Sequence, residues 1–342
     1  MSFGSTLEDR GYFHLHSRRV ADHADDASDN KVGVIGIVGM GGMGKTTFAQ
    51  VVYNDKDVRE HFNLTTWVCV SEDFDPFGVT KTILDGVTSS TSNIEDLNEL
   101  QLQLKEKLNG NKFLLILDDV WNKNNNDWEI LSDPFKSGAQ GSRIIVTTHD
   151  DEVASVMRTF ATHPVKKLPV QERWSLFARH AFHDANSNAH LELQEFGQKI
   201  VEKCQGLPLV IKTIGGPLQF KLDVCEWEKV LSRELWELSN NETKNILPAL
   251  RLSYRYLPLD LKPCLAYCSI LLKDHAFKKE QLILLWMAEG LLHAMENKTM
   301  EQIGDDYFYT LISRSLFQRS SEDESCIVMH DLINDLANFC IR

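Results

Sequence analysis

The chain has 342 residues, of which 43% are hydrophobic and 25% are charged, a composition typical of a globular protein with two or three domains. Its net charge of −13 argues against a general affinity for nucleic-acid backbones, which attract basic surfaces. No apolar run approaches the roughly 18 residues of a membrane span, and the N-terminus lacks the layout of a signal peptide. The seven cysteines are scattered and odd in number, as in proteins with reduced thiols, so we expect a cytoplasmic location.

Residues 1–31 are polar and rich in histidine and aspartate, without helical or strand periodicity. The segment has three histidines, His14, His16 and His23, and one interpretation is that they bind a metal. The favoured interpretation is that the segment is a poorly ordered polar leader. Regular structure is expected to begin at Val32, with a continuous apolar run that ends at Gly39.

Residues 32–168 are predicted to form an α/β domain with a parallel sheet and helices on both faces. Helical patterns separate most of the strand-like runs, and one has Leu97, Leu100, Leu104 and Leu108 on a single stripe before Asn109-Gly110. Apolar runs of this kind are typical of parallel strands covered on both sides. The expected strands are VGVIGIVG, LTTWVCV, KFLLILD, SRIIVTT and HPVKKL.

The remaining sequence is mostly helical. Residues 169–242 carry 3.6-residue apolar periodicity and predict a small helical subdomain. Residues 243–342 predict a second helical subdomain in which Leu282–Leu292 is expected to form a buried helix. Two short strand-like runs, SLFQRS and SCIVMH, indicate that this subdomain is a winged-helix unit.

The stretch GMGGMGKTT fits the pattern G-x-x-x-x-G-K-[ST], which forms a phosphate-binding loop between a strand and a helix. Its glycines let successive backbone N–H groups point at phosphate oxygens, its lysine adds a cation, and its hydroxyl is a ligand for Mg²⁺. The predicted nucleotide-binding residues of this loop are Gly39, Gly41, Gly42, Gly44, Lys45, Thr46 and Thr47.

Two carboxylates, Asp118 and Asp119, end the strand LLILDD and are expected at the same edge of the sheet as the phosphate loop. In such sites the first acid holds Mg²⁺ and the second orients or deprotonates an attacking water. Paired acids at a strand end are otherwise ordinary turn formers. The phosphate loop upstream favours the functional interpretation.

The ordered motifs GMGGMGKTT, LLILDDVW, GSRIIVTT, GLPL, CLAYCSI and VMHD resemble the NB-ARC module of plant intracellular immune receptors. The motif LLILDDVW ends in a tryptophan, Trp121, and in this it resembles the coiled-coil class of these receptors rather than the TIR class. The resemblance covers Val32 to the C-terminus. It implies a switch that ADP holds closed and that exchange for ATP opens, so that the receptor oligomerises.

The resemblance also implies roles for individual residues. Lys45 and Thr46 would bind the phosphates, with Thr46 and Asp118 holding Mg²⁺ and Asp119 as the candidate catalytic base. Pro208 of GLPL would lie near the adenine. His330 of VMHD would reach the β-phosphate of ADP from the winged-helix subdomain, so that the nucleotide links two domains. Asp331 is expected to cap or orient the helix that follows rather than to contact the nucleotide.

Two departures from the family pattern stand out. The strand GSRIIVTT is followed by His149 where the family usually has an arginine that senses the γ-phosphate. An imidazole is shorter and cannot make the two-pronged contact of a guanidinium, so we expect weak discrimination of ATP from ADP through this position. The leader also lacks a convincing Gly-Arg element to enclose the adenine.

The favoured function is therefore an ADP- or ATP-binding switch with at most slow hydrolysis. Its expected partners are the coiled-coil and leucine-rich-repeat domains of a full receptor, with no specific nucleic acid. The first alternative is an ATPase motor of the AAA+ kind, which requires an arginine finger supplied across a ring. The second is a winged-helix DNA-binding regulator, which the net charge of −13 disfavours.

Overall fold

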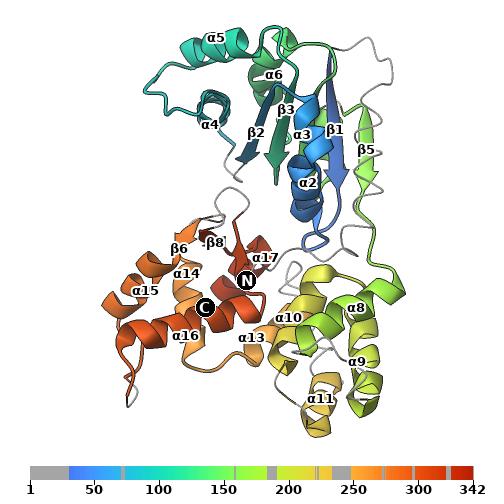
Figure 1. Cartoon of the computed structure of the whole chain (residues 1–342), viewed down its shortest axis with the longest axis vertical. Helices are drawn as coiled ribbons and strands as arrows, with labels where there is room; N and C mark the ends of the chain where they lie inside the picture. Colours follow the sequence, from blue (N-terminus) through green and yellow to red (C-terminus); the bar gives the residue numbers. More distant parts are fainter. Residues whose placement is uncertain are drawn as a thin grey trace. The chain divides into compact units, whose positions relative to one another are not determined.

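The computed structural model forms two compact units (Figure 1). One comprises the chain up to Met40 and Gly44–Lys166, and the other comprises Gly41–Met43 and Lys167–Arg342. The predicted polar leader lies outside the described residues except for its last residue, Lys31. The structure describes residues 31–70, 74–157, 159–182, 191–219, 221, 223–232, 248–271, 273, 275–294, 297–320 and 325–341.

The first unit contains the predicted parallel sheet, with five strands in the order β2-β3-β4-β1-β5. Its last strand is Ala161–Pro164, which overlaps the expected run HPVKKL only at His163 and Pro164. The central strands β3 and β4 are buried along their whole length, in line with the apolar and β-branched residues that make up most of both sequences. The strands are β1 (Val32–Val38), β2 (Leu64–Cys69), β3 (Phe113–Asp118), β4 (Ser142–Thr148) and β5 (Ala161–Pro164).

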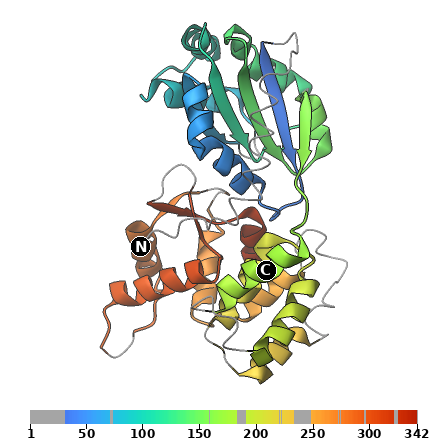
Figure 2. The ribbon, with the colours of Figure 1, turned by 45° about the vertical axis from the view of Figure 1, so that its right-hand side comes forward.

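Helices cover both faces of this sheet (Figure 2). On one face pack α2 (Lys45–Asn54) and α3 (Lys56–His61), which bury Phe48, Ala49, Val52 and Val58. The leucine stripe predicted from the sequence lies on the opposite face, where Leu100, Leu104 and Leu108 are almost fully buried. The elements of that face are α4 (Pro76–Thr88), α5 (Leu97–Leu108), α6 (Asn125–Ser132), the 3-10 turn η1 (Pro134–Ser137) and α7 (Asp151–Val156).

The second unit is mostly helical. Its first helices are α8 (Val170–Ala181), α9 (Leu191–Lys203), α10 (Pro208–Leu218) and α11 (Val224–Leu231). Two glycines in α10 allow close packing: a Cβ on Gly215 would lie 2.9 Å from Cβ of His180, and one on Gly216 would lie 2.7 Å from Cα of Arg314. Helix α10 thus packs tightly against α8 and against the end of α16 (Met300–Ser313).

The C-terminal part of this unit has a three-stranded antiparallel sheet in the order β6-β8-β7. Strands β7 (Gln318–Arg319) and β8 (Cys326–Val328) lie in the two runs predicted as strands, whereas β6 (Phe277–Lys278) has only two residues and was not predicted. The helices here are α13 (Pro248–Arg255), α14 (Leu261–Cys268), α15 (Lys279–Ala288) and α17 (Asp331–Ile341).

The helix expected at Leu282–Leu292 forms as α15, but it ends at Ala288 and is buried on one face only. Helix α15 buries Leu282, Ile283 and Trp286, but Leu284 is 59% exposed and Leu285 is 39% exposed. The run is apolar on all sides, so its composition does not reveal that only one face packs on the core. Within the described segments, no helix has the length and apolar character required to cross a bilayer.

Candidate functional site

The phosphate loop has the backbone that its glycines were expected to provide. The N–H of Gly39 donates to the carbonyl of Thr148 (3.2 Å), which ties the start of the loop to the end of β4. Gly42 has φ 75° and Gly44 has φ 92°, a left-handed conformation that is unfavourable for residues with a Cβ. Helix α2 starts directly after Gly44, so its positive end is available to an anion.

The polar residues that follow the loop lie in the first turn of α2. Lys45 is 8% exposed, and its Nζ donates to the carbonyl of Met40 (3.4 Å), so the loop curls around the ammonium group. Thr46 is half-buried and Thr47 is exposed. The ammonium of Lys45 and the N–H groups of this turn form a donor set suited to the phosphates of a nucleotide.

The tip of the phosphate loop, Gly41–Met43, belongs to the second unit. There, the N–H of Leu209 donates to the carbonyl of Gly42 (3.2 Å). A Cβ on Gly41 would lie 3.1 Å from Cδ1 of Leu332, and one on Gly42 would lie 3.0 Å from Cβ of Leu209. Pro208 occupies the first turn of α10, next to Leu209. The GLPL segment thus contacts the loop tip through its own Leu209, and Leu332, the residue after VMHD, lies beside the tip as well.

Asp118 lies at the end of β3 and is 4% exposed. Its Oδ1 accepts hydrogen bonds from Oγ1 of Thr46 (3.1 Å) and from Oγ1 of Thr147 (2.5 Å). The Thr46 bond joins residues 72 positions apart in sequence, and it brings the two residues predicted to hold Mg²⁺ into contact. A hydroxyl beside a carboxylate fits this cation, which keeps several waters and binds through one or two carboxylates together with phosphate oxygens.

Asp119 adopts a left-handed conformation, with φ 56°. Its N–H donates to Oγ1 of Thr147 (2.9 Å), and its Oδ2 accepts a hydrogen bond from the indole N–H of Trp121 (2.9 Å). The main chain therefore turns sharply between the two acids, so that Asp118 is buried while Asp119 is half-buried. The sequence indicated neither interaction of Asp119.

His149 directly follows β4, and its side chain is exposed. Its ring lies against that of Trp121, with the centroids 4.0 Å apart and the planes at 41°. The next residue, Asp150, caps helix α7 by accepting the N–H of Glu152. The ammonium of Lys123 donates to the carboxylates of Asp150 and Glu152 with N–O distances of 2.6 Å. These hydrogen bonds, that to Asp150 foremost, raise the pKa of Lys123 to about 12.

His330 caps helix α17 in the second unit. Its Nδ1 accepts the N–H of Leu332 (3.1 Å), and its carbonyl accepts the N–H groups of Ile333 and Asn334. Asp331, expected to cap or orient this helix, is not the cap and lies in the first helical turn, where its charge suits the helix dipole. Because Nδ1 is an acceptor, the hydrogen of the neutral ring lies on Nε2, which is therefore a donor.

Sequence reasoning missed two residues of this site. Thr147 lies inside a buried strand, where a β-branched residue is expected for packing alone. The sequence motif linked Trp121 only to the receptor class. A tryptophan two residues after a candidate base also has an indole N–H that can donate a hydrogen bond to that base.

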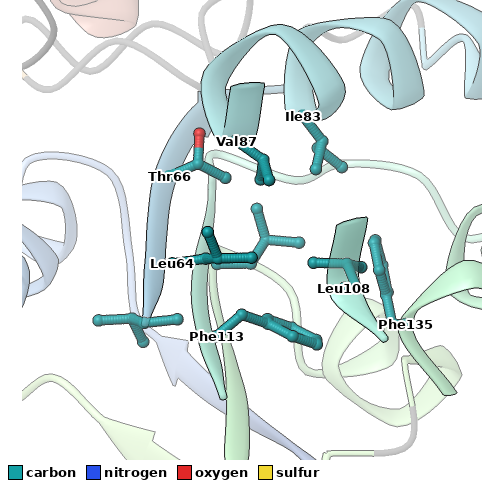
Figure 3. A pocket seen from close by; sticks show the side chains of 9 residues that line it. Leu64, Thr66, Ile83, Val87, Leu108, Phe113 and Phe135 are labelled. Carbon is teal, nitrogen blue, oxygen red and sulfur yellow. The ribbon is translucent and has the colours of Figure 1, made fainter. Parts of the chain in front are cut away.

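A pocket elsewhere in the first unit has a different character (Figure 3). It lies in the core cluster between the sheet and helices α4 and α5, and the hydroxyl of Thr66 is the one polar side-chain group in its lining. Such a lining does not suit a phosphate. The lining residues are Leu64, Thr66, Ile83, Val87, Leu108, Phe113, Leu114, Leu115 and Phe135.

Two family models match the chain. The model of the NB-ARC domain matches residues 15–187, and that of the disease resistance protein winged helix domain matches residues 270–337. These matches confirm the resemblance inferred from the six motifs and the winged-helix fold of the C-terminal part.

Curated relatives are disease resistance proteins. An RPP13-like disease resistance protein of Arabidopsis thaliana is 46% identical over 298 residues, which are 86% of this chain and 28% of the relative. Disease resistance protein RGA2 of Solanum bulbocastanum is 44% identical over 297 residues, which are 86% of this chain and 30% of the relative. The chain therefore spans less than a third of the length of these relatives.

Among solved structures, a signal transduction ATPase with numerous domains and a tetratricopeptide repeat sensor, from Pyrococcus horikoshii, has a similar fold. The TM-score is 0.57 at 17% identity, and the similarity covers 94% of this chain and 42% of that protein. At this identity the similarity establishes the fold alone.

Proposed function

Because this chain belongs to the NB-ARC family, we propose that it is the adenine-nucleotide switch of a plant disease-resistance receptor, closed with ADP and opened by exchange for ATP. Family membership implies nucleotide binding. The switch, its two nucleotide states and its oligomerisation with ATP are our proposal. So are its cytoplasmic location and its coiled-coil and leucine-rich-repeat partner domains.

The observation that carries this proposal is the hydrogen bond between Thr46 and Asp118 beside the buried Lys45. This hydrogen bond joins the end of the phosphate loop to the carboxylate of Asp118 at the end of β3. This combination serves a nucleoside di- or triphosphate: Lys45 would neutralise phosphate charge, and Thr46 and Asp118 would hold Mg²⁺. When bound, Mg²⁺ supplies further neutralisation of the phosphate oxygens.

The proposed dependence on phosphate state rests on His330. Its cap to α17 makes Nε2 the donor nitrogen of the neutral ring, as a histidine that binds a phosphate oxygen requires. A nucleotide that contacts this nitrogen in one conformation alone would stabilise that conformation by its differential affinity. We therefore assign His330 to ADP in the closed state.

The test is the nucleotide content of the purified protein, measured by acid extraction and chromatography. We expect retained ADP, with about one nucleotide per chain as in other tight single-site complexes. Lys45→Ala should abolish retention. Lys56→Ala is the matched control, because Lys56 is 84% exposed in an ion pair on helix α3 and should not affect retention. Equal retention in the two variants would refute the assignment of the phosphate loop.

The rate of ATP cleavage separates a switch from a motor. Under single-turnover conditions the switch should cleave ATP more slowly than about one per minute, compared with roughly 1–100 per second for kinases. Repeated turnover every second would instead favour an ATPase motor.

A further inference from the structure

Strand β4 and the loop after β3 each contribute one residue that binds the candidate base. The hydroxyl of Thr147 accepts the N–H of Asp119 at 2.9 Å and so holds its backbone, which has a left-handed conformation with φ 56°. The indole N–H of Trp121 then binds Oδ2 of Asp119 at 2.9 Å. A carboxylate side chain has two rotatable bonds, so this second bond restricts the direction in which its other oxygen points.

Trp121 is itself held by the loop after β4. The ring of His149 lies on it at a centroid distance of 4.0 Å, close enough for direct ring contact. Two residues further on, Lys123 joins Asp150 and Glu152 at the start of α7. These contacts connect the segment after Asp119 to the segment after β4 through side chains on both loops.

We propose that Trp121 is a positioning residue for ATP cleavage, holding the carboxylate of Asp119 towards the attacking water, and that His149 acts through Trp121 rather than on the γ-phosphate. This inference rests on the proposed nucleotide function. It gives His149 a role that requires only ring contact, which an imidazole makes as well as a larger side chain.

The step served by this arrangement is hydrolysis. The water oxygen forms a bond to the γ-phosphorus while the bond from that phosphorus to the β–γ bridging oxygen breaks. The bridging oxygen leaves with the electron pair as part of ADP, and a proton of the water passes to Asp119. If the carboxylate of Asp119 pointed in another direction, the protein would bind nucleotide equally well but would cleave ATP more slowly.

The main variant is Trp121→Phe, which keeps an aromatic ring for His149 but removes the N–H that binds Asp119. We expect the single-turnover rate to fall about tenfold, with ADP affinity unchanged within about twofold, because only the orientation of the base is lost. The matched control is Trp128→Phe. Trp128 lies on α6 with its ring against Phe135 in the core, and its substitution should leave the cleavage rate unchanged.

A double-mutant comparison separates positioning from general stabilisation. In an Asp119→Asn background, Trp121→Phe should cause no further loss of rate, because the group that Trp121 orients no longer acts as a base. His149→Ala should slow cleavage in the wild-type background but not in the Trp121→Phe background. Additive effects in either comparison would overturn the inference.

The hydrogen bond also has a readout that does not depend on cleavage. In nitrogen-15 NMR spectra, the indole signal that Trp121→Phe removes should shift in Asp119→Asn, and an unshifted signal would overturn the inference. Protein that retains ADP but cleaves no ATP over a day would overturn it as well, while leaving the switch standing. Protein that retains no nucleotide, even with the expected indole shift, would refute the proposed switch instead.

Discussion

Replacing Thr147 by valine should destabilise the first unit far more than its small change in volume suggests. The hydroxyl is fully buried and has two partners: it donates to the carboxylate of Asp118 at 2.5 Å and accepts the N–H of Asp119 at 2.9 Å. A bond to a charged group contributes about 1.5–3 kcal/mol, and a buried N–H left without a partner costs about 1–3 kcal/mol. Because the two losses share one site, we expect a total of about 2–4 kcal/mol.

The assay is urea-induced unfolding with EDTA and a fixed ADP concentration, analysed by linear extrapolation. Thr147→Ser is the matched control, since serine keeps the hydroxyl and loses one methyl group, at a cost of about 1 kcal/mol. The valine variant should therefore be less stable than the serine variant. Equal stability of the two, or a more stable valine variant, would refute the role given to this hydroxyl.

Three further predictions concern the second unit. Hydrogen bonds from Lys221 and Lys229 lower the pKa of Glu226 to about 2 from 4.5. This half-buried acid therefore contributes stability above pH 4.5 that is lost as the pH falls towards 2. Glu226→Gln should flatten the fall of the melting temperature over that range. Burial raises the pKa of the Cys204 thiol to about 12, so iodoacetamide at pH 8 should label the exposed Cys225 and spare Cys204, as mass spectrometry would reveal. His330→Ala should lower the free energy of unfolding by about 1 kcal/mol through loss of the helix cap, whereas His330→Asn should not, and both should reduce ADP retention.

Much of the fold follows from the sequence because the inner strands of the first unit, β1, β3 and β4, are buried along most or all of their length. Such strands are continuous apolar runs, and the glycine loop identifies the first of them as the strand before a phosphate site. The pattern was less informative in the second unit. Strand β6 has only two residues, too few to show alternation, and α15 has apolar residues on its exposed face as well as its buried one.

The candidate site was predictable where its residues form a contiguous motif and not where they meet only in three dimensions. The sequence predicts the loop from Gly39 to Thr46 because phosphate binding requires glycines, a lysine and a hydroxyl at fixed spacing. It predicts Asp118 and Asp119 because they stand at the end of an apolar strand. The roles of Thr147 and Trp121 depend on the left-handed conformation of Asp119. No pattern in the sequence predicts that conformation at this position. Aspartate adopts that conformation more often than most residues do, but the pattern gives no sign of where.

The observed helix cap of His330 and its proposed contact with ADP need not compete for one side chain. As a helix cap, its ring nitrogen Nδ1 must be an acceptor, and this requirement places the hydrogen of the neutral ring on Nε2. The cap also fixes the orientation of the ring relative to α17, so the donor is preorganised before any nucleotide arrives. Asparagine can replace the cap with its carbonyl oxygen, but it has no ring nitrogen opposite that oxygen. A loss of ADP retention in His330→Asn with unchanged stability would therefore assign the nucleotide contact to the ring itself rather than to the integrity of the helix.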